Sequence, residues 1–458
     1  MEYNSLDELL KKTETIKGKC INDIIKDENV LDGRKTLKKR KGFLGDLIET
    51  EFYQYPNNNV SEADFDKLGI ELKTSGLKIN KNGSISAKER LVLTMINYFD
   101  ITDETFETSH LLEKNEKILI LWYVYDKNKD IKDFKFVEYL LYSIYQDEIV
   151  IRNDYEIIQG KVINGLAHEL SEGDTTYLGA CTKSTKGSNR TQQPFLDYDV
   201  KPRAFCLKQK YMTSLIRDYY GNNLKHKRPK YNSVINYVYH KLETYFGKTQ
   251  LEIAKDLGLK FDKVPKNLNK MISDRLIGKD NELNQQDSIF MNSVYLIKNC
   301  PVQEDYWPLE RMTFPTFKFG DFDKNWEESY WKSYFEQLTM IIICFEGNRI
   351  SKNGERILKS VKKVSFTNKD LLSIEKAFNC IKNAINQYNS DIVKKDLEDY
   401  VKLLPTPKKF KNQIIEIVPK ASKGKNSYYN LFTGEKSTKT SFALTKPFLY
   451  KKFTQHKK

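Results

Sequence analysis

The stretch DFDKLGIELKTS, residues 64 to 75, places Asp64, Glu71 and Lys73 around a short apolar run. In a strand, successive side chains point to opposite faces, so Glu71 and Lys73 share one face while their apolar neighbours hold the other in the core. Asp64 lies seven residues before Glu71, across the turn-forming letters DKLG, and a hairpin there would return it to the same place. The stretch therefore indicates either a strand with a solvated charged edge or the metal centre of a nuclease.

The metal reading has a simple chemical basis. Hydrolysis of a phosphodiester needs a cation beside the phosphate and an activated water, and Mg²⁺ prefers oxygen ligands, commonly a few carboxylates with water and phosphate. We expect Asp64 and Glu71 to be metal ligands, with the main-chain carbonyl of Leu72 as a third. Lys73 is expected to orient and polarise the attacking water.

Composition limits the class of protein. With 458 residues and 39% hydrophobic residues, the chain is long enough for two or three globular domains. Lys and Arg outnumber Asp and Glu by 76 to 62, a net charge of +14 that favours a polyanionic partner. Nucleic acid is the first candidate and a membrane surface the second. No apolar run has the length of a signal peptide or a spanning helix, so we expect a cytoplasmic protein without a membrane partner.

The pattern of apolar residues along the chain predicts a mixed α/β fold. Helical spacing marks residues 4–28 and the start of GDLIETEF at Gly45, and residues 68–146 read as strands. The segment RAFCLKQKYMTSLIRDYYG reads as a strand running into a helix, and residues 223–285 are mainly helical. Within the latter, GKTQLEIAKDLGL (247–259) is similar to the first half of a helix-turn-helix, although an ordinary packing helix is the preferred interpretation.

The two ends of the chain resemble each other. TKSTKGSN (182–189) matches PKASKGKN (419–426) at four of eight positions, and each match precedes a phenylalanine, Phe205 or Phe442, by the same distance. KERLVL (88–93) has a counterpart in LERMTF (309–314), in the same order along the chain. Matches in order indicate a diverged internal duplication.

The second copy keeps the scaffold and loses the acids. In the frame that aligns the two ends, Glu71 falls on Leu296, and the position that matches Asp64 is Ile289. Residues 405–458 nevertheless contain thirteen lysines and two acids, Glu416 and Glu435. That imbalance favours a DNA-binding face over an ordinary surface.

Three runs resemble the MutH family, a branch of the PD-(D/E)xK nucleases: KGFLGDLIETEF, EADFDKLGIELKT and FETSHLLEK. The chain is still more similar to the longer Type II restriction enzymes of this group, the Sau-type enzymes that cut at GATC. That likeness runs through SAKERLVLTMINY, GLAHELSEG, YLGACTK and RAFCLKQKYMTS. It covers nearly all of residues 40–217 and implies a restriction-endonuclease-like fold, here duplicated with a helical connector.

The resemblance also implies roles for individual residues. The family's metal and catalytic positions fall on Asp64, Glu71 and Lys73, its helix glutamate falls on Glu49, and a further catalytic or phosphate-contacting lysine falls on Lys114. The chain departs from MutH at two positions: Cys181 stands where MutH has an arginine that contacts bases, and Cys206 stands where it has a tyrosine. The alternatives for the basic residues of this region are side chains that are merely solvated and, for the arginine at 203, a structural contact that holds a loop to the core. DNA contacts are the preferred interpretation, and they are expected at Arg90, Lys183, Lys186, Arg203, Lys208, Lys210, Lys420, Lys423 and Lys446.

Together these features predict a Type II restriction endonuclease that makes Mg²⁺-dependent double-strand breaks at GATC, 5′ to the G. The expected domains are a catalytic one (1–222), a helical connector (223–285) and a non-cleaving DNA-binding effector (286–458). We expect dimerisation on DNA, looping between two sites and a companion methyltransferase. The alternatives are a GATC-specific mismatch-repair nicking endonuclease and a GATC-binding regulator without catalysis.

Overall fold

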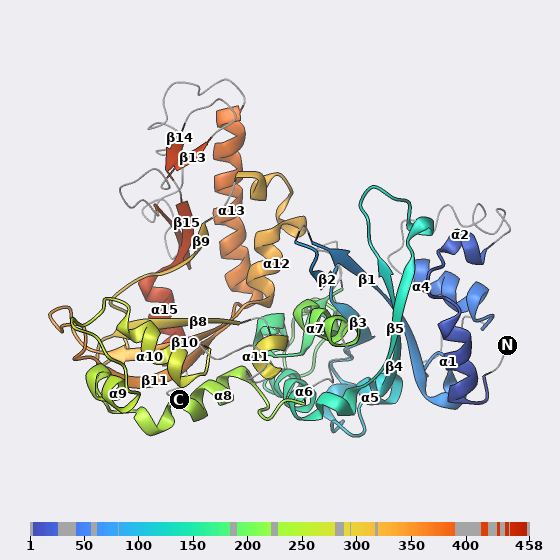
Figure 1. Ribbon diagram of the computed structural model, residues 1–458, viewed down its shortest axis with the longest axis horizontal. Helices are drawn as coiled ribbons and strands as arrows, with labels where there is room; N and C mark the ends of the chain where they lie inside the picture. The colour runs from blue at the N-terminus through green and yellow to red at the C-terminus, as the bar shows by residue number, and fades with distance from the viewer. Residues whose placement is uncertain are drawn as a thin grey trace. The chain divides into compact units, whose positions relative to one another are not determined.

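The computed structural model describes thirteen segments of the chain: residues 3–25, 43–55, 62–80, 82–183, 190–220, 228–279, 288–293, 295–316, 319–389, 414–419, 428–430, 436–438 and 440–455 (Figure 1). The chain divides into two compact units. The first unit comprises Met1–Ser233 and Asp287–Ser293, and the second comprises Val234–Gln286 and Val294–Lys458. Most of the helical segment 223–285 thus groups with the second unit.

The first unit contains a four-stranded sheet in the order β2-β1-β4-β5, in which β1 runs parallel to β4 and the other pairs are antiparallel. The strands are β1 (Ile70–Ile79), β2 (Ile85–Ala87), β4 (Lys117–Val124) and β5 (Phe136–Ser143). The sequence KILILWYV of β4 is nearly continuous in apolar residues, and all but its two end residues are buried, as a strand covered on both faces requires. Glu71 and Lys73 of β1 are therefore carried next to a buried central strand.

Four helical segments near the N-terminus pack on this sheet: α1 (Leu6–Glu14), α2 (Ile21–Ile24), α4 (Phe43–Leu47) and a π-helix (Ile48–Phe52). Their apolar side chains, among them Leu9 and Ile48, form one core with Leu72 of β1 and Leu121 of β4. Figure 1 shows α1 and α4 beside the β4–β5 ribbon. The helices expected within residues 4–28 and near Gly45 are confirmed.

A second, antiparallel sheet in the first unit has the order β3-β7-β6. Its strands are β3 (Leu91–Met95), β6 (Leu178–Thr182) and β7 (Arg203–Leu207). The accompanying helices are α5 (His110–Asn115), α6 (Glu148–Ile163), α7 (Gln209–Tyr219) and α11 (Ser288–Asn292). The expected strand running into a helix is confirmed by β7 and α7. Helix α5 interrupts the region that the sequence assigned to strands alone.

The second unit also contains two three-stranded sheets, in the orders β11-β10-β8 and β12-β15-β9, and a β13-β14 pair. The strands are β8 (Tyr295–Val302), β9 (Met312–Thr316), β10 (Thr339–Glu346), β11 (Ile357–Val364), β12 (Ile415–Pro419), β13 (Tyr428–Asn430), β14 (Lys436–Thr438) and β15 (Thr440–Leu444). The helices are α8 (Val234–Leu242), α9 (Gln250–Asp256), α10 (Leu268–Leu276), α12 (Tyr330–Gln337), α13 (Asn368–Asn389) and α15 (Lys446–Thr454).

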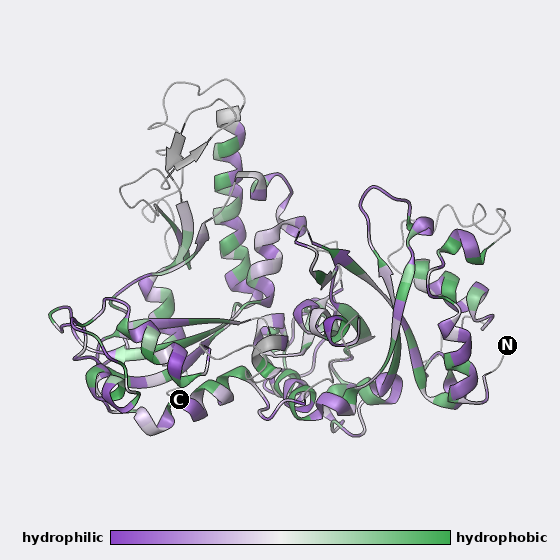
Figure 2. Ribbon diagram, in the orientation of Figure 1, coloured by the Kyte–Doolittle hydropathy of each residue, from purple (hydrophilic) through white to green (hydrophobic). Residues whose placement is uncertain are grey.

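Aromatic side chains dominate the core of the second unit. Trp331, Phe335 and Phe442 are almost fully buried and meet in edge-to-face or stacked ring contacts. Helix α13 adds apolar residues at helical spacing, including Ile374 and Phe378, and Figure 2 shows green and purple bands alternating along it. The helix thus buries one stripe against the core.

The two units repeat the same strand pairings. In the first sheet of each, a leading strand runs parallel to a buried strand, which pairs antiparallel with the next: β1, β4 and β5 in one unit, β8, β10 and β11 in the other. The leading strands begin in equivalent register, at Ile70 and Tyr295, so Glu71 corresponds to Leu296. In the second sheets, Leu91 pairs with Leu207 as Met312 pairs with Leu444. This register reproduces the sequence alignment of the two halves.

The helices provide one further observation. Within the described residues, none is both long enough and apolar enough to cross a membrane.

Candidate active site

A tight turn folds the chain back between Asp64 and Glu71. Phe65 and Ile70 exchange two main-chain hydrogen bonds, with N···O distances of 2.9 and 3.3 Å, around a short 3-10 helix (Asp66–Leu68). Gly69 completes the turn with φ 61° and ψ 38°, a left-handed conformation that strains residues with a side chain. The hairpin expected from the sequence is thereby confirmed.

The turn brings the two acids together. The Leu72 N–H donates to Asp64 Oδ2 at 2.9 Å, and the Asp64 N–H donates to Glu71 Oε2 at 3.2 Å. Each carboxylate is thus fixed by a main-chain donor from the other strand segment. Glu71 is 1% exposed, so the expected solvated strand edge does not describe it.

Two lysines approach the same carboxylate oxygen. Lys73 Nζ donates a hydrogen bond to Glu71 Oε1, and Lys114 Nζ lies 3.9 Å from that atom. Lys73 comes from β1 itself and Lys114 from the last turn of α5. The structure therefore gathers Asp64, Glu71, Lys73 and Lys114 in one place, as the sequence predicted.

Glu49 adds a third acid from the π-helix. Its side chain is 9% exposed, and within the described residues its Oε1 has no hydrogen-bond partner. Burial raises the pKa of Glu49 to about 7, and the negative charge of Asp64 acts in the same direction. Burial also raises the pKa of Glu71, although the Lys73 ammonium opposes this shift. The site is thus rich in mutually repelling carboxylates that a cation would stabilise.

We expect the substitution Glu49→Gln to stabilise the protein in the absence of metal ions. Because the pKa of Glu49 is about 7 when folded and near 4.5 when unfolded, ionisation between these values penalises the folded state. The variant should raise the free energy of unfolding by about 1–3 kcal/mol above pH 7. Denaturant unfolding in EDTA across pH 4 to 8 measures this.

The gain from Glu49→Gln should shrink as the pH falls and vanish below about pH 4.5, where the carboxyl is protonated in both states. Glu51→Gln, on the same helix, is the control, and a gain that does not change with pH would contradict this explanation.

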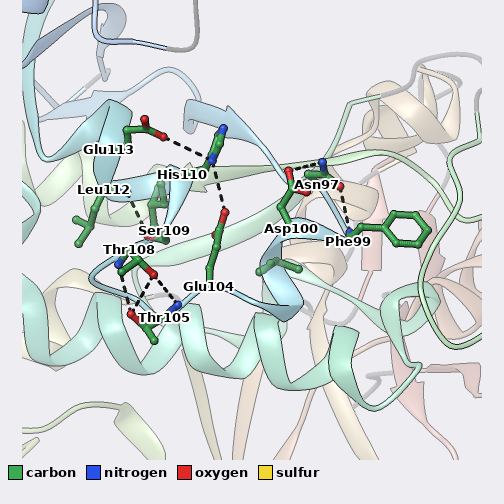
Figure 3. Close-up of polar contacts among 12 residues, drawn as sticks. Asn97, Phe99, Asp100, Glu104, Thr105, Thr108, Ser109, His110, Leu112 and Glu113 are labelled. Atoms are coloured by element: carbon green, nitrogen blue, oxygen red, sulfur yellow. Dashed lines mark hydrogen bonds and ion pairs between the residues drawn. The ribbon is translucent and has the colours of Figure 1, made fainter.

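Helix α5, which carries Lys114, is held by polar contacts around its N-terminus (Figure 3). Ser109 caps the helix by accepting from the Leu112 N–H at 3.3 Å. His110 Nδ1 lies 3.5 Å from a carboxylate oxygen of both Glu104 and Glu113. Glu104 in turn accepts from the Tyr155 hydroxyl of α6 at 3.1 Å. His110 therefore belongs to the framework that positions Lys114.

The donor set fits a hard divalent cation. Asp64 and Glu71 offer carboxylate oxygens side by side, and Glu49 Oε1 is a buried oxygen without a hydrogen-bond partner in the described chain. No three His, Cys, Asp or Glu side chains in the described segments form a complete metal-binding group. A cation here would therefore need main-chain oxygen, water or phosphate as well, which is the usual situation of Mg²⁺. The role expected for the Leu72 carbonyl stays a prediction.

The basic residues expected to contact DNA have different environments. Lys183 is exposed at the end of β6, and Lys210 is half-buried on α7, where burial lowers its pKa. Arg90 forms an ion pair with the buried carboxylate of Glu172. Lys186, Lys420 and Lys423 lie outside the described residues.

Two of the predicted DNA contacts need correction. Arg203 and Lys208 are each 1% exposed and donate to main-chain carbonyls, of Ala180 and Thr175 respectively. Lys446 is half-buried and donates to the Leu309 carbonyl, and its contact with DNA stays a prediction. The Arg203 and Lys208 side chains hold strands and turns together, so they are not available to DNA in this structure. For Arg203, the structural tie considered as an alternative is the better description.

Sequence reasoning missed two acids that organise the second sheet. Glu172 is fully buried against Arg90, and Asp154 accepts hydrogen bonds from three successive main-chain N–H groups at the start of β6. Glu172 lies in GLAHELSEG, a run already noted for its resemblance, but its partner is far away in sequence. Burial of a charged side chain has no local signal, so neither acid stood out.

Comparison with known proteins agrees with this geometry. Residues 53–154 match the family model described as DNA mismatch repair enzyme MutH, which covers Asp64, Glu71, Lys73 and Lys114. The chain is 31% identical over 363 residues to the Type II restriction enzyme Sau3AI of Staphylococcus aureus. That alignment covers 74% of this chain and 73% of the relative.

These matches make the chain a site-specific deoxyribonuclease, a class that acts on DNA, with the PD-(D/E)xK nuclease fold of the MutH domain. Restriction nucleases of this superfamily generally use a divalent metal, and the site formed by Asp64, Glu71 and Glu49 has the carboxylate oxygens that such a metal prefers. The protein belongs to the family of the Type II restriction enzyme Sau3AI and is a restriction endonuclease.

Proposed function

We propose that this enzyme cuts both strands of DNA at GATC, 5′ to the G, with Mg²⁺ held by Asp64, Glu71 and the Leu72 carbonyl. The observation that carries the proposal is the pair of reciprocal contacts between the Asp64 and Glu71 segments, with Lys73 bonded to Glu71 beside them. A strand without catalytic duties would have little reason to bury a carboxylate among other acids, because such burial is costly.

The chain's own residues divide the remaining work. Bound Mg²⁺ would supply the positive charge that offsets the phosphate and lowers the pKa of a water. Lys73, anchored on Glu71, orients the attacking water toward the phosphate. Lys114 adds positive charge beside the same carboxylate. Glu49, with a pKa of about 7, holds a water at the edge of the site.

The proposed target can be tested with short duplexes. A labelled duplex with one central GATC should be cut 5′ to the G, and each duplex with one changed base pair should be cut at least about tenfold more slowly, since a mismatched pair costs roughly 1–3 kcal/mol. Single-turnover cleavage with Mg²⁺ measures these rates. Equal rates across the series would contradict GATC recognition.

We propose that the domain plan of residues 1–222, 223–285 and 286–458 corresponds to a nuclease, a connector and a DNA-binding effector that does not cut. In the second unit, Leu296 occupies the place of Glu71 on the leading strand. A unit without that acid can still bind DNA. We therefore propose that it binds a second GATC site and activates the first unit, with looping of the DNA and transient dimerisation for double-strand cleavage.

A plasmid with two GATC sites should be cut several-fold faster than a matched plasmid with one site. A second site on the same molecule raises the local concentration of effector DNA. Free GATC duplex, added in trans, should likewise speed up cleavage of the one-site plasmid. Initial rates on the two plasmids, with and without added GATC duplex, measure this. Equal rates on the two plasmids, with no change when GATC duplex is added, would contradict the effector role.

Two other functions are less well supported. A mismatch-repair nicking enzyme needs only one domain, whereas the likeness to the restriction enzyme extends over 363 residues, more than either unit alone. A regulator without catalysis would not need the buried acids of the first unit. We also propose a companion methyltransferase, because a restriction enzyme of this type would otherwise cut the DNA of its own cell.

A further inference from the structure

Two arginines occupy equivalent places in the two units. Arg90 directly precedes β3, and Arg311 directly precedes β9. The strands they introduce have the same register against the third strand, since Leu91 faces Leu207 and Met312 faces Leu444. The duplicated fold has thus kept an arginine at the same entry to the second sheet.

Each arginine pairs with a buried carboxylate, but the two carboxylates come from different parts of the fold. Arg90 pairs with Glu172, which is fully buried in a short 3-10 helix (Glu172–Asp174). Arg311 Nη1 lies 3.0 Å from Oε1 of Glu416, which is 7% exposed on β12. Both units therefore contain an ion pair at this arginine, but its carboxylate comes from a 3-10 helix in the first unit and from a strand in the second.

The place of Glu416 in the second unit is taken by Gly179 in the first. Gly179 pairs with Cys206, and Glu416 pairs with Ala443, each one residue before the leucine that fixes the register. A Cβ on Gly179 would lie 3.3 Å from Glu172 Cγ and 3.3 Å from Cys206 Sγ. The glycine thus leaves space for Glu172 to reach in from the side.

Stability alone does not account for this recurrence. A buried ion pair contributes little net stability compared with apolar residues of similar size. The second unit has lost Glu71, which only cutting needs, but its arginine has a carboxylate again. A feature present in both units fits the task that both are proposed to share, which is DNA binding.

The arginines have the exposure that a DNA contact requires. The side chain is 27% exposed for Arg90 and 51% exposed for Arg311, while each carboxylate holds one side of the guanidinium. A guanidinium fixed in this way is a rigid fork, suited to the O6 and N7 acceptors of guanine in the major groove. GATC carries one guanine on each strand.

We propose that Arg90 reads guanine in the sequence cut by the first unit and that Glu172 is a positioning residue that holds its guanidinium. The second unit carries the same device as Arg311 with Glu416. This inference rests on the proposed recognition of GATC.

The first test compares GATC duplexes that contain guanine or 7-deazaguanine, which lacks the N7 acceptor. Cleavage reports on the first unit, which holds the acids. The wild-type enzyme should cut the modified duplex about tenfold more slowly, whereas Arg90→Met should cut both duplexes at the same reduced rate. If Arg90→Met keeps the full response to 7-deazaguanine, the inference is wrong. If the wild-type enzyme shows no preference for GATC at all, the proposed function fails first.

The second test transfers the arrangement of the second unit into the first. Glu172→Gln should reduce the rate ratio between GATC and single-change duplexes, with a cooperative unfolding transition and a wild-type near-ultraviolet circular dichroism spectrum showing that the protein is folded. The triple variant Glu172→Ala, Gly179→Glu, Cys206→Ala removes Glu172 and introduces the counterparts of Glu416 and Ala443, and it should restore that ratio. If Glu172 acts by positioning Arg90, a carboxylate supplied from position 179 should replace it. A folded triple variant with no better discrimination than Glu172→Gln would therefore overturn the positioning role.

Discussion

The Asp64→Asn enzyme is expected to cut GATC duplexes at least about 1,000-fold more slowly than the wild type, a loss of roughly 4 kcal/mol in transition-state stabilisation. Asp64 supplies one of the two adjacent carboxylates, and asparagine removes its charge while keeping its shape. Because the Leu72 N–H can still donate to the amide oxygen, the turn should survive. Single-turnover cleavage with saturating enzyme measures the chemical step directly.

Asp66→Asn is the matched control for this prediction. Asp66 lies in the same turn and accepts from the Tyr55 hydroxyl at 2.7 Å, but it is exposed, and within the described residues it forms no hydrogen bond with Glu71. Its cleavage rate should stay within about threefold of the wild type, as for surface substitutions away from special features. If the two asparagine variants lost activity equally, the turn and not the Asp64 carboxylate would be responsible. Duplex affinity in EDTA should be similar for all three proteins.

The Asp154→Ala protein is expected to lose about 3–5 kcal/mol of stability in the first unit, the cost typical of breaking a buried charged network. Asp154 is fully buried on α6 and accepts from the N–H groups of Thr176, Tyr177 and Leu178 at 2.7, 2.6 and 2.9 Å. Burial raises its pKa to about 6, although the Lys208 charge and these donors oppose the shift. Alanine would leave three buried donors without an acceptor.

Denaturant unfolding monitored by hydrogen exchange can assign this loss to the first unit. Glu156→Ala on the same helix, at an exposed position, should change stability by less than about 0.5 kcal/mol. Asp154→Asn, which keeps one acceptor oxygen, should fall between the two. A loss below 1 kcal/mol for Asp154→Ala would show that the start of β6 does not depend on this acid.

The sequence predicted the catalytic turn well because its signals are local. Alternation placed Glu71 and Lys73 on one face of β1, and the turn-forming letters DKLG predicted the hairpin that brings Asp64 back to Glu71. The duplication could also be predicted, because the matching runs preserve strand register: Phe205 and Phe442 occupy the same position in their sheets. Both features depend on neighbours in sequence or on equal spacing.

Other features depend on contacts between distant parts of the chain. Arg203 and Lys208 seemed available to DNA because charged residues are usually solvated, but the second sheet buries both against carbonyl groups. Glu172 and Asp154 could not be singled out, since burial and partners arise only when the sheet forms. Helix α5 was hidden because six residues are too few for a clear helical period.

The most direct test of the central claim is to sequence the ends of unmethylated plasmid DNA digested by the purified enzyme with Mg²⁺, beside an EDTA control. The account predicts discrete fragments, each with a 5′ end that begins GATC, and intact plasmid in EDTA. Fragments with other ends, or cleavage that persists in EDTA, would contradict a metal-dependent enzyme that cuts at GATC.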